Sequence, residues 1–194
     1  MEAPLPVVMV SCGEGKEKNI ITIAWTGIVN SEPPMTYISV RPERHSYDII
    51  KNSGEFVINL VSEELVKACD WCGVKSGAKF DKWKEMKLTP EPADTVKCPM
   101  IGESPVNLEC KVVESHDYPT HTMFVAEIVG MHVEEGLIDE KGRIALEEAN
   151  LVAYSHGEYM PLKRRNTGTF GFSVMKKSTK RKRAQAARAN KTKK

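Results

Sequence analysis

Short apolar runs along the chain predict β-strands rather than helices. Phe56, Ile58 and Leu60 alternate with other residues in 55–61, and this is the two-residue period of a strand. The same features, or runs rich in β-branched residues, mark six segments in all: 7–12, 20–25, 35–42, 55–61, 106–115 and 121–135. Because turn residues separate them, we expect a mostly β fold, an antiparallel barrel or sandwich of about six strands.

Two short segments, 43–53 and 63–72, are predicted to be helices. Gly54 suits the position after the first helix, and Ser62 suits the N-cap of the second. So few helices argue against a doubly wound α/β fold. The glycines at 13–15 begin like a dinucleotide-binding loop, but no third glycine follows at the right spacing, and the context is a turn between two strands.

Composition indicates a cytoplasmic globular protein without a membrane span. The 194 residues are enough for one domain with a core, and no window approaches the roughly 18 apolar residues that cross a membrane. The first residues do not resemble a signal peptide. An odd number of scattered cysteines is typical of free thiols in a reducing compartment, and the chain has five: Cys12, Cys69, Cys72, Cys98 and Cys110.

Charge divides the chain unevenly, although its formal net charge is only +2. Residues 176–194 contain ten Lys or Arg and no acidic residue, which leaves the rest of the chain acidic. We therefore expect a domain over 1–176 and a basic, disordered tail over 177–194. The tail either binds nucleic acid weakly through phosphate contacts or only solubilises the protein, and it contains no aromatic residue for base stacking.

The stretch from Asn19 to Ser46 contains the residues best suited to bind a ligand. Arg41, Arg44 and Ser46 stand at a predicted helix entry, where guanidinium groups, a hydroxyl and backbone amides suit a phosphate. Upstream, Trp25 and Thr26 end a predicted strand and suit the flank of an aromatic ligand. On the pattern alone, a surface turn with a half-buried tryptophan is the simpler interpretation.

The ordered set of motifs over about residues 4–176 resembles the flavin reductase-like, flavoredoxin family. These motifs are Asn19-x-x-Thr22-x-Ala24-Trp25-Thr26, Pro33-Pro34, Ser39-Val40-Arg41-Pro42-x-Arg44-x-Ser46, Phe56-x-x-Asn59, Lys75-Ser76-Gly77 with Asp81-Lys82, Asn107-Leu108-Glu109-Cys110, and Gly168-Thr169-Phe170-Gly171-Phe172-Ser173. The resemblance implies an antiparallel split β-barrel of the FMN-binding type with short helices. It also implies a homodimer with FMN near the subunit interface.

The same resemblance implies roles for individual residues. Those implied to contact the flavin are Asn19, Trp25, Thr26 and Lys82, and those implied for the phosphate are Arg41, Arg44 and Ser46. A lysine beside the ring can stabilise negative charge on reduced flavin. Without the resemblance, Lys82 is better interpreted as a surface lysine. Tyr154 and Tyr159 either cover the ring or simply pack.

Three functions remain open at this stage. The first is an NAD(P)H-dependent flavin reductase, and the second is a carrier that keeps FMN bound and exchanges electrons with a redox partner protein. The third is a nucleic-acid-binding protein that acts through its tail. Cys69 and Cys72 form a CxxC, but it lies at the end of a predicted helix, so we interpret them as buried thiols. The histidines and Cys98 have no metal-ligand spacing, and no metal site is predicted.

Overall fold

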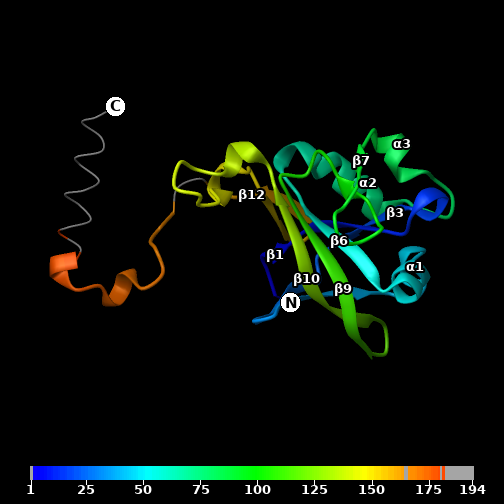
Figure 1. The fold of residues 1–194 in the computed structure, drawn as a ribbon, viewed down its shortest axis with the longest axis horizontal. Helices are drawn as coiled ribbons and strands as arrows, with labels where there is room; N and C mark the ends of the chain where they lie inside the picture. The colour runs from blue at the N-terminus through cyan, green and yellow to red at the C-terminus, as the bar shows by residue number, and fades with distance from the viewer. Residues whose placement is uncertain (1, 164–165, 180, 182–194) are drawn as a thin grey trace. The chain divides into compact units, whose positions relative to one another are not determined.

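The computed structural model describes residues 2–163, 166–179 and 181 (Figure 1). The chain divides into two compact units, Met1–Leu162 and Lys163–Lys194. Most of the basic tail, with its predicted contacts to nucleic acid, lies outside the described residues, and the expected boundary at residue 176 stays a prediction. None of the helices in the described part is long and apolar enough to cross a membrane.

The first unit is built on one large antiparallel sheet, as the sequence predicts. Seven strands are hydrogen-bonded in the order β3-β2-β6-β9-β10-β5-β4, and every pair is antiparallel. Their bounds are Val8–Cys12 (β2), Asn19–Ile23 (β3), Thr26–Ser31 (β4), Pro34–Val40 (β5), Glu55–Leu60 (β6), Val106–Asp117 (β9) and Thr122–Val133 (β10). The two long predicted strands, 106–115 and 121–135, are confirmed as β9 and β10, and they pair with each other as a hairpin.

The two ends of this sheet curl toward each other. β3 contacts β5, although the two strands are far apart in the sheet order. Ala24 and Trp25 link β3 to β4, and the Ser39 amide donates to the Trp25 carbonyl at 2.9 Å. Apolar side chains fill the inside of the curl, among them Val10, Ile38, Ile50, Phe56 and Phe124, all buried. A nearly closed barrel is the result.

Three short helices accompany the barrel: α1 (Ser46–Ser53), α2 (Val66–Val74) and α3 (Lys82–Met86). α2 and α3 lie together near one end of the unit, and the β9–β10 turn lies at the opposite end (Figure 1). Gly54 ends α1 with φ 68°, and its amide donates to Ile50, as predicted. Contrary to the prediction, Ser62 is not the N-cap of α2 but precedes a 3-10 turn over Glu63–Leu65, and its side chain makes no capping bond.

Smaller elements complete the first unit. β1 (Leu5–Pro6), β11 (Val152–Ser155) and β12 (Glu158–Pro161) form a three-stranded sheet, and β7 (Pro90–Glu91) pairs with β8 (Met100–Ile101). Single 3-10 turns cover Gly15–Glu17, Glu135–Leu137 and Leu146–Glu148. In the second unit, a 3-10 turn covers Phe172–Val174.

Residues 94–101, which we call the covering segment, are fixed to the sheet by buried polar side chains. Asn59 Oδ1 accepts from the Ile101 amide at 2.9 Å, and Asn107 Nδ2 donates to the Ile101 carbonyl at 3.1 Å. Glu109, with no exposed surface, accepts from the backbone amides of residues 94, 95 and 96. These bonds satisfy backbone groups of a segment with little regular structure of its own. Asn59, Asn107 and Glu109 in the family motifs therefore serve the fold.

Candidate functional site

A cavity of about 350 Å³ collects four of the predicted site residues. Its lining residues are Asn19, Ile21, Glu43, Arg44, His45, Ser46, Cys72, Gly73, Lys75, Ser76, Gly77 and Lys82. We call it the Lys82 cavity. This lining contains three cationic residues, Arg44, Lys75 and Lys82, and one carboxylate, Glu43. The net positive charge of the cavity favours an anionic or electron-rich ligand.

Lys82 is buried, contrary to the interpretation as a surface lysine. It begins α3, and only 4% of its surface is exposed. Its Nζ donates to the carbonyls of Ile20 and Cys72, both at 2.7 Å. Burial lowers the pKa of the ammonium to about 8. An ammonium has three N–H donors, so one donor remains for a ligand in the cavity that Lys82 lines.

Asn19 and Ser46 form a buried pair that lines the same cavity. Asn19 Nδ2 donates to Ser46 Oγ at 2.8 Å, and Ser46 is 1% exposed. Ser46 therefore orients the Asn19 amide. Gly77 lies so close that a Cβ atom at this position would overlap the Asn19 side chain. The glycine of the Lys75-Ser76-Gly77 motif is thus explained by this close approach.

A second, smaller cavity of about 150 Å³ shares Ile21 and Arg44 with the first. It is also lined by Trp25, Arg41 and His121. The Trp25 ring is half exposed and lies 4.4 Å from the His121 ring, measured between centroids, at an angle of 43°. No sequence pattern marks His121, because the pairing of β10 with β5 brings it here from nearly a hundred residues away. Arg44 joins the two cavities into one site with cationic and aromatic parts.

Two predicted residues do not line either cavity. Thr26 begins β4 beside Trp25, and its hydroxyl donates to the Tyr37 carbonyl at 2.7 Å. Tyr154 lies on β11, where its ring packs edge-on against Tyr159 with centroids 5.4 Å apart. Both residues have evident structural roles, and their contact with a flavin stays a prediction.

The CxxC cysteines are buried thiols. Cys69 and Cys72 both lie on α2 and are free. Burial raises the pKa of Cys69 to about 12 and that of Cys72 to about 11. Both thiols therefore stay protonated near neutral pH, which disfavours thiolate chemistry.

A cavity of about 760 Å³ shares His45 and Gly77 with the Lys82 cavity. It contains none of the predicted site residues. Four carboxylates and two lysines line it: Glu14, Glu17, Asp48, Glu55, Lys16 and Lys97. This acidic lining suits a phosphate less well than the Lys82 cavity does.

Comparisons with known proteins point to one family. Residues 1–163 match the model of the flavin reductase like domain. An uncharacterized protein of Archaeoglobus fulgidus is 35% identical over 133 residues, which cover 69% of this chain and 73% of the relative. One of Pyrococcus abyssi is 33% identical over 132 residues, covering 68% and 76%.

Solved structures show the same fold. The flavoredoxin of Desulfovibrio vulgaris superposes with a TM-score of 0.83 at 28% identity, covering 89% of this chain and 94% of that one. The flavoredoxin of Methanosarcina acetivorans gives 0.78 at 29% identity, covering 89% and 93%. The predicted split barrel is therefore confirmed, and the chain belongs to the flavin reductase-like domain family.

Proposed function

We propose that the chain binds FMN at the joined cavities and uses it for redox chemistry. The observation that carries this proposal is Lys82, a buried ammonium with one donor left over in a cavity that Arg44 and Lys75 also line. A buried charge is costly unless it is paired, so a ligand acceptor or anion at this place would stabilise it. The two flavoredoxins, whose structures match along almost the whole chain, support the same cofactor class.

The described residues fit the parts of FMN. Lys82 and Asn19 offer hydrogen-bonding groups for the polar edge of the ring, and Trp25 with His121 offers an aromatic surface. Arg41 and Arg44 are the candidates for the phosphate, and Ser46 acts through Asn19. Bound FMN would supply the acceptance and release of two electrons or a hydride. The chain contributes the positive charge that stabilises a reduced, anionic ring.

Uptake of the cofactor tests the proposal directly. After mixing with FMN and desalting, the protein should retain flavin absorbance at about 450 nm, as an oxidised isoalloxazine does. FMN should bind more tightly than riboflavin, and Arg44→Gln should reduce this preference about tenfold, because a charge-assisted contact to the phosphate is lost. Lys51→Gln, on the exposed side of α1, is the matched control and should keep the preference. Equal affinity of wild-type protein for FMN and riboflavin would remove the phosphate role.

The reaction is proposed to be NAD(P)H-dependent flavin reduction, in line with the family. Electron carriage with permanently bound FMN is the second candidate, and the two flavoredoxin structures favour it. Oxidation of NADH or NADPH with added FMN distinguishes them. Steady turnover with excess FMN indicates a reductase, whereas a single turnover of bound FMN indicates a carrier.

A homodimer is also proposed, because the sheet has an exposed apolar edge. β4 ends the strand order, and its Ile28 and Val29 are 73% and 51% exposed. An edge strand with apolar side chains is unusual unless a partner covers it. Light scattering at micromolar concentration should give the mass of two chains, and Ile28→Glu should shift it to one. A monomeric wild-type protein would contradict the proposal.

A further inference from the structure

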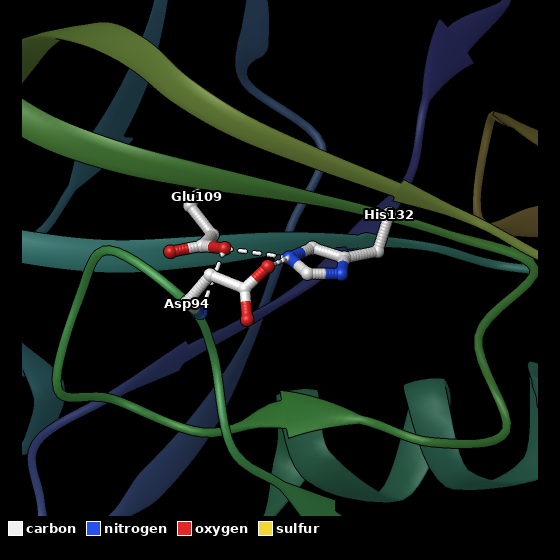
Figure 2. Close-up of side chains that lie close together, drawn as sticks. All are labelled: Asp94, Glu109 and His132. Atoms are coloured by element: carbon white, nitrogen blue, oxygen red, sulfur yellow. Dashed lines mark hydrogen bonds and ion pairs between the residues drawn. The ribbon is translucent and has the colours of Figure 1, made fainter.

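Three side chains from distant parts of the sequence meet near the covering segment, away from the cavities described above. Asp94, Glu109 and His132 each direct one possible ligand atom at the others, and the three atoms lie within 4.8 Å of one another (Figure 2). His132 Nε2 is 2.6 Å from Glu109 Oε1 and 3.8 Å from Asp94 Oδ2. None of the three lines the Lys82 cavity.

We propose that Asp94, Glu109 and His132 form a binding site for one divalent transition-metal ion of the zinc class. Imidazole nitrogen and carboxylate oxygen are both zinc ligands. Three protein ligands leave a further position for water, and the Asp94 side chain, 85% exposed, gives access from solvent. The ion would stand apart from the redox site and tie the covering segment to the sheet.

The sheet is locally shaped to hold the Glu109 carboxylate. Glu109 on β9 lies opposite Gly130 on β10, next to an irregularity in the strand register between Ile128 and Gly130. A Cβ atom at Gly130 would lie only 2.9 Å from Glu109 Oε1. The glycine therefore leaves room for the carboxylate, and the backbone amides of residues 94–96 fix its orientation.

The negative charge of Asp94 and Glu109 makes the cluster suited to a cation. Glu109 is fully buried, and in the described part of the chain the ion pairs of Asp94 and Glu109 involve His132 rather than a lysine or arginine. Hydrogen bonds from His132 and from the backbone amides of residues 94–96 stabilise this carboxylate, and a bound cation would add a full counter-charge. When the His132 imidazole is neutral, Asp94 and Glu109 together carry two negative charges, which one divalent ion balances.

Binding requires a simple exchange and a small movement. The Nε2–H proton of His132 leaves to solvent, and the freed nitrogen lone pair and Glu109 Oε1 each bind the ion. Metal–ligand distances of about 2.0–2.2 Å need ligand atoms roughly 3 Å apart, so His132 and Glu109 separate slightly while Asp94 closes in. Asp94 can do so because its side chain is exposed, and its backbone amide, bonded to Glu109 Oε1 at 3.0 Å, keeps it nearby.

Calorimetric titration of the EDTA-treated full chain with ZnCl₂ tests the site. We expect one ion per chain with micromolar affinity, and a rise in melting temperature at saturation. Asp94→Asn and His132→Gln should each weaken binding at least about tenfold. Both variants should fold, because Asp94 is exposed and glutamine can still donate to Glu109. His116→Ala, at an exposed two-residue ion pair on β9, is the control and should bind as wild type does.

Cobalt gives a second readout that does not depend on activity. Co²⁺ bound to nitrogen and oxygen ligands absorbs visible light, and the band should appear in the wild type and in His116→Ala but not in His132→Gln. Zinc binding that is absent at millimolar concentration, or equal in wild type, Asp94→Asn and His132→Gln, would overturn the proposal.

Discussion

Replacing Lys82 with methionine is expected to weaken FMN binding by about 10- to 100-fold, since it removes a charge-assisted hydrogen bond to the ligand. The wild-type affinity should fall as pH rises above about 8, the pKa to which burial lowers the ammonium. Below that pH the group is charged and can bind an acceptor, and above it the charge is lost. The variant should show no such fall. Fluorescence titration of FMN across pH 6.5–9.5 (roughly spanning the lowered pKa) measures both effects.

The exposed lysine of the same helix, Lys84, provides the control. Lys84→Met should bind FMN as wild type does at every pH. Lys82→Met should keep the fold, because removing a buried charge spares its desolvation cost. If Lys82→Met binds FMN as tightly as Lys84→Met, Lys82 does not contact the cofactor.

Glu109→Gln is expected to cost about 3 kcal/mol of the free energy of unfolding in metal-free protein. Burial by itself raises the pKa of this carboxyl, but the hydrogen bonds from His132 and three backbone amides outweigh it and lower the pKa to about 2 from 4.5. The carboxylate therefore stabilises the folded chain fully above pH 4.5, and this contribution disappears as pH falls toward 2. A glutamine at this position has no negative charge. Its amide N–H groups would also face the backbone N–H groups of residues 94–96, so hydrogen bonds are lost.

Thermal unfolding at pH 7 should show a melting temperature lower by about 6–12 °C for this variant. The difference from wild type should shrink as the pH falls below 4.5. Glu114→Gln, on the exposed part of β9, should differ little from wild type. A melting temperature for Glu109→Gln equal to that of Glu114→Gln would mean that the covering segment does not depend on the buried carboxylate.

The strands of the barrel could be predicted because burial imposes a pattern on them. β2, β3, β6, β9 and β10 have apolar runs or alternation that match a buried face. β4 was not predicted, because it is a largely exposed edge strand. Without a buried face, its sequence shows no alternation of apolar and polar residues. α3 was missed because a helix of five residues is too short for a 3.6-residue period to show.

The site could be predicted only in part, because the spacing of residues along the chain does not show which of them lie close together in the fold. Asn19, Arg44, Ser46 and Lys82 were found through motifs, and the structure brings them to one cavity. The burial of Lys82 was not predictable, since it depends on carbonyl groups of β3 and α2. His121 is placed by the pairing of β10 with β5, and Asp94 meets Glu109 and His132 through the path of the covering segment. No local signal in the sequence reveals either arrangement.

The covering segment is bound mainly through its backbone, and this has a consequence for how its sequence can change over time. Glu109, Asn59 and Asn107 recognise amides and carbonyls that every non-proline residue possesses. Substitutions at Thr95 and Lys97, whose side chains face solvent, can therefore accumulate without altering the path of the chain. The side chains that fix the path of this segment lie on other strands. Sequence change is therefore constrained at Asn59 on β6 and at Asn107 and Glu109 on β9. Exposed positions of the covering segment can acquire new side chains beside the cavity of about 760 Å³.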